Sequence, residues 1–232
     1  MTGLLDRDLD VRWLDAALRV AREGLELADA RDTLATELAD EPLGAAAMKK
    51  TLTALTAVWL RPASSRNEIT DWALRHSASA PDWRPLHFGA LLVSQPSFRV
   101  LLHACGRELV AAGGVDTVAV RRRMRAAFGP RRTVDIATQR GIKTLRSLAV
   151  LAGDPSSSHS ARGHLSATDP ELAAWLVRCL LDSRQAESMS VDDVIHAPEF
   201  FALKLPKTFP RQAVGLRRHS EGIGRVVLVL DQ

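Results

Sequence analysis

The residues with the clearest chemical potential are nine arginines and lysines between positions 121 and 146, which face a single acid, Asp135. They are Arg121, Arg122, Arg123, Arg125, Arg131, Arg132, Arg140, Lys143 and Arg146. This segment carries a formal charge of +8, whereas the whole 232-residue chain carries +4. A solvated helix normally mixes charges of both signs, so such a local imbalance predicts a surface that binds a polyanion. Nucleic acid is the most available polyanion in a cell.

Catalytic and metal-binding chemistry has little support in the sequence. No HExxH, paired CxxC, Walker loop or GxSxG element is present. His159 and His164 lie in a serine-rich stretch without a neighbouring cysteine or cluster of acids. Four residues follow an order loosely similar to that of restriction-type nucleases: Asp192, Asp193, Glu199 and Lys204. Ala202, however, stands where such a nuclease needs a metal ligand, so we expect a non-enzymatic protein with neither metal nor cofactor.

The composition bounds the class of protein. Hydrophobic residues make up 46% and charged residues 25%, which is typical of a globular protein with a real core. No apolar run approaches the ~18–20 residues that a membrane span needs, and the first residues are charged rather than signal-like. The two cysteines, Cys105 and Cys179, lie in apolar stretches of helical period, which favours buried free thiols over a disulfide. These features together favour a cytoplasmic location.

The first half of the chain is predicted to be helical. Residues 1–41 hold eleven acids and five bases, with apolar residues at helical spacing. Their negative charge either serves solubility or shields the basic segment when no ligand is bound. Further helices are expected over 42–60 and from a cap at Ser64 or Ser65 to Leu74, followed by a loop over 77–85. The apolar stretch 86–112 predicts two helices broken at Pro96 and stopped by Gly113 and Gly114.

The basic segment itself predicts two helices. Asp116 or Thr117 caps the first, which ends near Phe128, and Gly129 and Pro130 form a tight break. Thr133 caps the second, with Asp135 in its first turn. Its apolar side carries Val134, Ala137, Ile142, Leu145 and Leu148. Its polar side carries Arg132, Asp135, Gln139, Lys143 and Arg146, so the helix is amphipathic with a basic wet face.

The remainder of the chain is expected to contain both helices and strands. The stretch over 152–167 reads AGDPSSSHSARGHLSA and predicts a flexible loop that ends in a short strand near His164 and Leu165. Helices are expected over 170–181, capped by Thr168 or Asp169, and over 191–196. Strands are expected over 200–205 and 225–230, with a basic helical piece between them that carries Arg211, Arg217 and Arg218.

This order of elements matches a helix-turn-helix followed by a wing. We therefore expect a mainly α protein with a helical domain over 1–113, a winged-helix-like unit over 114–168 and a C-terminal α/β segment over 169–232. The second helix would lie in the major groove, where arginine and glutamine pair with base edges. The exposed side chains there would be Arg132, Asp135, Gln139, Arg140 and Lys143. Phosphate contacts would come from Arg121, Arg122, Arg125 and Arg131, and the 154–164 loop would add Arg162 and His164.

A second basic group lies near the end of the chain. Six bases between positions 204 and 225 face one acid, Glu221, for a sum of +5: Lys204, Lys207, Arg211, Arg217, Arg218 and Arg225. This C-terminal basic group matters for DNA binding only if folding places it on the same face as the central segment.

Two parts of the sequence resemble the BrxA family of the bacterial BREX phage-defence systems. They are the pattern RRRMRAAFGPRRTVDIATQRGIKTLRSLAVLAG over 121–153 and the element PEFFALKL over 198–205, which follow a helical first half. The resemblance implies a small, mostly helical DNA-binding component of a multi-protein defence complex, with no catalytic residues to carry over. The family has been labelled as membrane proteins, a label that the absence of any apolar span argues against here.

The sequence thus predicts duplex DNA binding, with the site formed by Arg121, Arg122, Arg125, Arg131, Arg132, Gln139, Arg140, Lys143, Arg146 and Arg162. One such helix reads few bases, so an operator site would require a homodimer. Two alternatives remain open at this point: a scaffold that docks an acidic partner protein, and RNA binding. The DNA-binding prediction requires that the basic groups stay open to water rather than being paired by carboxylates from the acidic first residues of the chain.

Overall fold

The computed structural model describes residues 4–60, 67–153, 158–222 and 224–231. Within this part of the chain the protein is mainly helical: 58% of the residues are in helices, ten of which are α-helices, and a few small strands accompany them. The helices are α1 (Val11–Arg22), α2 (Leu27–Glu37), α3 (Ala45–Val58), α4 (Glu68–His76), α5 (Arg84–Ser94), α6 (Pro96–Ala112), α7 (Thr117–Phe128), α8 (Arg132–Ser147), α9 (Pro170–Arg184) and α10 (Val191–Ile195). The prediction of a mainly α protein is confirmed.

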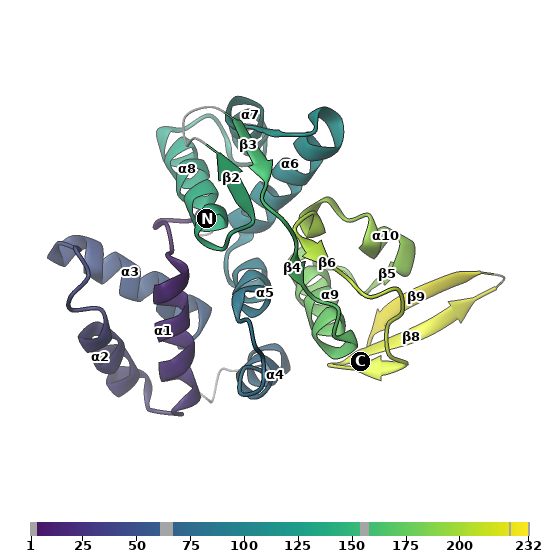
Figure 1. Ribbon diagram of the computed structural model, residues 1–232, viewed down its shortest axis with the longest axis horizontal. Coiled ribbons are helices and arrows are strands. Elements are labelled where there is room, and N and C mark those ends of the chain that lie inside the picture. The colour runs from purple at the N-terminus through teal and green to yellow at the C-terminus, as the bar shows by residue number, and fades with distance from the viewer. Residues whose placement is uncertain (1–3, 61–66, 154–157, 223, 232) are drawn as a thin grey trace.

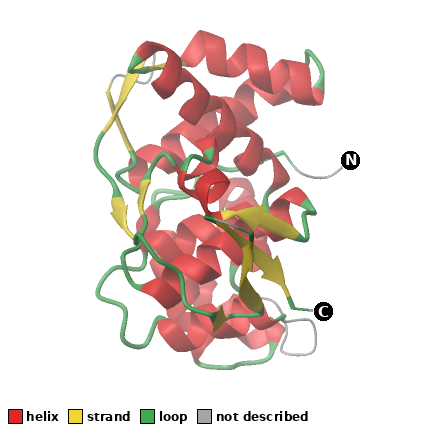
Figure 2. Ribbon diagram, turned by 90° about the vertical axis from the view of Figure 1, so that its right-hand side faces the viewer, coloured by secondary structure: helices red, strands yellow, loops and turns green. Residues whose placement is uncertain are grey.

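The strands form three small sheets at the surface of this helical body (Figure 2). They are β1 (Val115–Asp116), β2 (Leu151–Gly153), β3 (Ser158–Ala161), β4 (Leu165–Ser166), β5 (Ser188–Ser190), β6 (Leu203–Lys204), β7 (Gln212–Ala213), β8 (Leu216–Glu221) and β9 (Arg225–Leu230). Their orders are β1-β3-β2, β4-β6 and β5-β9-β8-β7. Among the strand pairs of the described residues, β4–β6 is the one parallel pair.

The elements form three groups (Figure 1). Helices α1, α2 and α3 pack against one another, and α5 packs against both α3 and α9. Helices α6, α7 and α8 form a second group together with β1, β2 and β3. The third group holds α9, α10 and the β8–β9 hairpin. One buried apolar cluster runs through all three groups, with Trp59, Trp175, Phe88 and Phe98 as its largest fully buried side chains.

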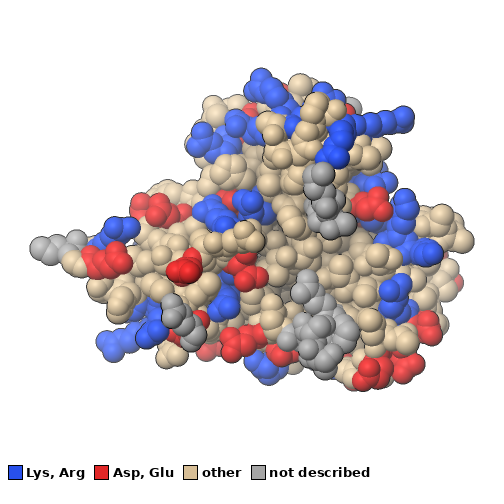
Figure 3. All heavy atoms as spheres, turned by 180° about the vertical axis from the view of Figure 1, so that it is seen from behind, with Lys and Arg blue, Asp and Glu red and all other residues tan. Residues whose placement is uncertain are grey.

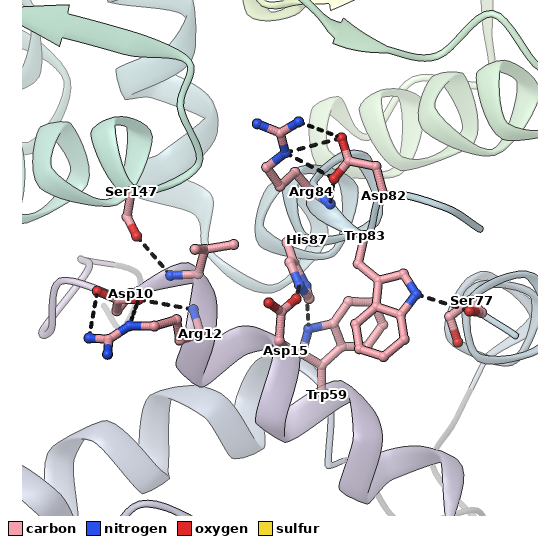
Figure 4. A network of polar contacts seen from close by, with 11 residues as sticks. Asp10, Arg12, Asp15, Trp59, Ser77, Asp82, Trp83, Arg84, His87 and Ser147 are labelled. Carbon is pink, nitrogen blue, oxygen red and sulfur yellow. Dashed lines mark hydrogen bonds and ion pairs between the residues drawn. The ribbon is translucent and has the colours of Figure 1, made fainter. Parts of the chain in front are cut away.

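A buried polar network joins α1 to α5 within this core (Figure 4). The Nε2 of His87 lies 2.9 Å from Oδ1 of Asp15, and its Nδ1 accepts a hydrogen bond from the indole N–H of Trp59 at 3.1 Å. Burial lowers the pKa of His87, although the hydrogen bond to Asp15 and the charges of Asp15 and Asp82 oppose this shift. Because both ring nitrogens are engaged, His87 is a neutral connector between helices rather than an available base.

Several predicted boundaries agree with the structure. Pro96 separates α5 from α6, Gly113 ends α6 in the left-handed region at φ 69°, and Asp169 caps α9 through the N–H groups of Glu171 and Leu172. Cys105 and Cys179 are buried free thiols, as expected. Burial raises the pKa of Cys105 to about 12, so its thiol stays protonated and unreactive at neutral pH.

Other local predictions were wrong or fall outside the described residues. Ser64 and Ser65 lie outside them, and the cap of α4 is Asn67, whose side chain accepts from the N–H of Thr70. Of the predicted strand over 200–205, only β6 is extended, because Phe200 ends a 3₁₀ turn (Pro198–Phe200) and residues 201–202 form a further turn. The 3₁₀ turn lies so close to α6 that a methyl group on Gly106 would overlap the carbonyl of Pro198.

The predicted basic helical piece between the last two strands is instead β7 and β8. Val214 and Gly215 both have positive φ, of 52° and 68°, and form the tight turn between these strands. Leu216 pairs with Leu230 and Arg217 with Val229, so the strand arises from long-range pairing with β9. Nothing local in the sequence showed that pairing, since a basic stretch of six residues suits either a helix or an exposed strand.

Candidate nucleic-acid interface

The central basic segment folds as two helices joined by a tight turn. Asp116 caps α7, and its carboxylate accepts hydrogen bonds from the N–H groups of Val118 and Ala119. Gly129 ends α7 with φ 86°, a conformation that a residue with a side chain rarely adopts. The carbonyl of Arg131 then accepts from the N–H groups of Val134 and Asp135 and begins α8. Thr133, predicted as the cap, already lies in the first turn, because the helix extends back to the glycine turn.

Helix α8 divides into a buried side and an exposed side much as its sequence pattern predicts. The buried side includes Val134, Ala137, Ile142 and Leu145, which join the core. On the opposite side Arg132, Gln139 and Lys143 are exposed, and Asp135, Ile136 and Arg146 are half-buried. The basic side chains of this face therefore follow from helical periodicity alone.

The elements around α8 complete a compact unit. Strand β1 precedes α7, and β2 and β3 follow α8 as an antiparallel pair. β1 joins the outer edge of β3, with Val115 opposite His159. Residues 154–157, in the loop between β2 and β3, lie outside the described part of the chain. Arg162 and His164, at the end of this predicted loop, are exposed, and the N–H of Arg162 donates to the carbonyl of Val150.

The first described residues of the chain, 4–10, lie along one flank of α8, and we call them the leading segment. Its backbone N–H groups donate to hydroxyl groups: Leu9 to Thr144 at 2.9 Å and Val11, the first residue of α1, to Ser147 at 2.8 Å. Leu5 donates to Ser97 in the same way. These contacts hold an extended acidic stretch against the basic helix.

Two bases of α8 lie next to acids of this leading segment. Arg140 donates to both the carboxylate and the backbone carbonyl of Asp6, with 3.0 Å between Nη1 and Oδ1. The Nζ of Lys143 lies 3.9 Å from Oδ2 of Asp8, which is a weak, exposed contact. The DNA-binding prediction required that carboxylates of the first residues leave the basic groups unpaired. This requirement is met only in part, because Asp6 pairs with Arg140.

Two further bases pair within the unit itself. Arg125 makes a bidentate contact with Asp135, at 2.7 and 2.6 Å, and so links α7 to α8. The hydrogen bond from Arg125 lowers the pKa of Asp135, and the charges of Arg125 and Arg121 act in the same direction. Arg123 pairs with the mostly buried Glu108 of α6 at 2.9 Å. Both pairs fix the helices relative to one another and remove Arg123 and Arg125 from the open positive charge.

Five arginines of the segment make no ion pair with any acid in the described part of the chain: Arg121, Arg122, Arg131, Arg132 and Arg146. Arg122, Arg131 and Arg132 are exposed, and Arg131 also donates to the carbonyl of Phe128 at 2.7 Å. Arg121 and Arg146 are half-buried. Blue spheres accordingly gather on the upper lobe of the protein in Figure 3, with little red among them.

The C-terminal basic group lies away from this unit. Arg217, Arg218 and Arg225 belong to β8 and β9, and Arg211 directly precedes β7, whereas α7 and α8 form the upper lobe of Figure 1. Arg217 pairs with Asp231 at 2.7 Å, Arg225 lies 3.6 Å from Glu221, and Arg218 donates to the carbonyl of Phe209. The two basic groups therefore do not form a single surface.

The acids among the residues with a loosely nuclease-like order have side-chain partners. Glu199 is buried, and its oxygens lie 2.6 Å from Nη2 of Arg184, 3.5 Å from Nδ1 of His103 and 3.9 Å from Nη1 of Arg99. Asp193 accepts a hydrogen bond from the Ser190 hydroxyl. Among the described residues, no group of three or more histidines, cysteines or acids is placed to hold a metal ion.

The sequence prediction missed the residues that position the leading segment. Thr144 and Ser147 each lie between a base and a leucine on α8, and this local pattern gave no sign of a distant partner. A weak signal existed in the alternating acids Asp6, Asp8 and Asp10, since in an extended segment such spacing places acids on one side.

No protein-family model, curated protein or solved structure matches the chain. No helix in the described part of the chain combines the length and apolar character that crossing a membrane would require.

Proposed function

We propose that the protein binds duplex DNA through α8 and the residues around it, and that it does so without catalysis. The observation that carries this proposal is the outer surface of α7 and α8, where five arginines have no acidic partner in the described part of the chain. Charges left open in this way can neutralise phosphates and release the counterions that surround DNA.

The arrangement of elements supports a winged helix. The order is α6, β1, α7, α8, β2 and β3, and β1 lies on the outer edge of the β2–β3 pair. In such a unit α8 enters the major groove, and α7 and the loop between β2 and β3 contact the backbone. Gln139 and Arg132 then face base edges, whereas Arg122 and Arg131 contact phosphates.

The predicted binding residues divide into three groups under this proposal. Arg132, Gln139, Lys143 and Arg146 lie on the outer face of α8, and Arg121, Arg122, Arg131 and Arg162 surround it. Arg125 and Arg140 differ from the rest because Asp135 and Asp6 hold them. They contribute to binding only if DNA displaces these carboxylates.

The central test is a gel-shift titration of a short DNA duplex with the variant Arg132→Ala/Lys143→Ala. We expect clearly weaker binding, because both side chains lie exposed on the same face of α8. The matched control is Lys204→Ala/Lys207→Ala, which removes two exposed bases of the C-terminal basic group and should leave affinity unchanged. If the α8 variant and the unaltered protein bind DNA with equal affinity, α8 is not part of the DNA-binding interface.

A second candidate is a scaffold that docks an acidic partner protein. It is favoured by one contact, since Asp6 already presents a carboxylate to Arg140 within this chain. RNA binding is the third candidate, because a basic helical surface can also hold duplex RNA by shape. A salt-dependent shift with duplex DNA, together with no discrete protein partner in a pull-down, would argue against the scaffold. Competition between duplex DNA, duplex RNA and single strands in the same titration separates DNA binding from RNA binding. Displacement of DNA by duplex RNA at equal concentration would favour RNA.

The biological setting is a separate part of the proposal. On the resemblance of residues 121–153 and 198–205 to the BrxA family, we place the protein in the cytoplasm as a component of a bacterial phage-defence complex. Adjacent genes for a methyltransferase, an ATPase and a phosphatase-like protein would support this setting. A homodimer is expected if the complex reads an operator-like site, since one α8 contacts few base pairs.

A further inference from the structure

A cavity of about 940 Å³ lies beside α8, on the flank covered by the leading segment. Its walls come from four places in the chain: the leading segment, one face of α3, the junction of α5 and α6, and the first turns of α8. Leu4, Ala54, Ala57 and Ile136 give it a largely aliphatic lining. The volume falls within the range of about 300–1,000 Å³ that small-molecule sites in proteins have.

Three cations line this cavity. Lys49 and Lys50 come from α3, and Arg140 comes from α8. Both lysines are exposed, and Lys49 makes no ion pair with an acid among the described residues. Lys50 and Arg140 come from separate helices and both lie beside Asp6, so the end of this largely apolar space where they meet is positively charged.

A carboxylate from the chain itself already uses this cationic end. Asp6 lies between two of the cations, with 3.0 Å from Oδ1 to Nη1 of Arg140 and 3.8 Å from Oδ2 to Nζ of Lys50. Its side chain keeps 69% of its surface exposed, so contact with the cations rather than burial holds it in place. The geometry shows that a carboxylate fits between α3 and α8 at the mouth of the cavity.

We propose that this cavity binds a small amphipathic anion, a molecule with an aliphatic body and a carboxylate or phosphate end. The body lies along the small side chains of α3, against Ala54 and Ala57. The anionic end takes the position of the Asp6 carboxylate beside Lys50 and Arg140, and Lys49 supplies a further charge. Neutral molecules of the same shape bind more weakly, because they gain no charge-assisted hydrogen bond to Lys49, Lys50 or Arg140.

Ligand binding at this position would act on the DNA interface. Ile136 and Arg140 belong to the same helix as Arg132 and Gln139, so an anion bound here adds negative charge beside the proposed DNA-facing surface. Only this consequence rests on the proposed function. Binding of the anion itself is independent of DNA and is measured without it.

Calorimetric titration of the full chain with decanoate, decyl phosphate and decanol tests the proposal. We expect saturable binding of the two anions with a stoichiometry of one and at least tenfold weaker binding of decanol. Lys49→Gln/Lys50→Gln should weaken anion binding about tenfold, because it removes two positive charges that line the cavity. Both side chains are exposed, so the change should leave folding intact. Lys204→Gln/Lys207→Gln removes the same charge elsewhere and should change nothing. Ala54→Phe, which fills the cavity, should abolish binding while circular dichroism shows an unchanged helix content.

Three results would overturn the proposal. The first is the absence of saturable binding of either anion, and the second is decanol binding as tightly as decanoate. The third is an unaltered chain that is dimeric in sedimentation and becomes monomeric on Ala54→Phe, because the cavity would then hold a second copy of the chain. Repeating the DNA titration with and without saturating decanoate distinguishes this proposal from the proposed function. If the protein binds no DNA under either condition, the proposed function fails, but the calorimetric measurement of anion binding still stands.

Discussion

The α7–α8 unit and the β7–β8–β9 sheet are both rich in arginine, but they differ in whether those arginines have acidic or carbonyl partners. In the sheet, Arg217 and Arg225 lie beside Asp231 and Glu221, and Arg218 reaches a backbone carbonyl. In the α7–α8 unit, five arginines have no acidic partner among the described residues. Density of positive charge along the chain is thus a poor guide to function until the partners of each base are known.

The difference has a physical origin in the two kinds of secondary structure. In the antiparallel β8–β9 hairpin, Glu221 is the backbone partner of Arg225, so the two side chains start close together. On α8 the side chains at three- and four-residue steps are bases or amides, except for Asp135, which Arg125 already holds. The helix therefore has too few acids to neutralise its own face.

The largest effect should come from the unpaired arginines. The variant Arg131→Gln/Arg132→Gln/Arg146→Gln should bind duplex DNA roughly a hundredfold more weakly, if each phosphate contact contributes about 1 kcal/mol. Fluorescence anisotropy with a labelled duplex measures this loss. The control Arg211→Gln/Arg217→Gln/Arg225→Gln removes equal charge from the C-terminal basic group. If both triple variants lose affinity for DNA equally, the claim that only the arginines of the α7–α8 unit contact DNA is wrong.

A second large effect should appear in stability, at the buried carboxylate of Glu199, whose partners come from α6 and α9. Glu199→Gln should lower the free energy of unfolding by about 2 kcal/mol, because Arg184 would keep its charge without a charged partner. Glu108→Gln, at the corresponding pair of the α7–α8 unit, should cost about 1 kcal/mol, since Arg123 is more exposed. Urea unfolding followed by circular dichroism compares the two variants. Equal losses in the free energy of unfolding would show that the deeper burial of the Glu199–Arg184 pair does not make it more important than the Glu108–Arg123 pair.

The same carboxylate makes stability depend on pH. Burial alone would raise the pKa of Glu199, but the hydrogen bond and charge of Arg184, with His103, lower it overall. A lowered pKa in the folded state means that this stabilisation is complete above the unfolded value, near 4.3. It is lost as the pH falls through the folded value. Unfolding curves at falling pH should therefore show a smaller acid-induced loss for Glu199→Gln than for the unaltered protein.

A smaller effect should follow from releasing the flank of α8. Asp6→Asn/Asp8→Asn should raise affinity for duplex DNA about fivefold, because it removes two negative charges beside the basic face at about 0.5 kcal/mol each. The control Asp29→Asn/Asp32→Asn makes the same charge change on exposed positions of α2. An identical gain in both variants would indicate an effect of net charge alone.

The smallest effect should come from the exposed pair of the hairpin. Asp231→Asn frees Arg217, whose side chain is 61% exposed, so its loss should cost less than about 1 kcal/mol of stability. The variant should also leave DNA affinity unchanged. If this single change produced strong DNA binding, the ion pair with Asp231, and not the location of the C-terminal basic group, would be what prevents that group from binding DNA.

Much of the helical framework could be predicted from the sequence because its signals are local. Pro96, Gly113, Gly129 and the caps Asp116 and Asp169 mark boundaries through the φ or hydrogen bond that each residue imposes. The basic face of α8 follows from the same local periodicity. The β7–β8 pair could not be predicted in this way, because it depends on pairing with β9.

The partners of the basic residues were equally hidden from the sequence. Arg140 and Asp6 are 134 positions apart, and no pattern within either segment indicates that they meet. Arg123 and Glu108 come from two helices whose packing fixes their contact. The types of residue in the candidate site were thus predictable, but which of them remain open was not.

The most direct measurement of the central claim is a titration of the unaltered protein with one DNA duplex at two ionic strengths, about 50 and 200 mM salt. If the unpaired arginines engage phosphates, the logarithm of the association constant should fall with the logarithm of salt concentration, at about 0.9 per phosphate. A slope of three or more would agree with the arginines left open on the α7–α8 unit. An association constant that does not change with salt, or no binding at the lower salt concentration, would contradict the account.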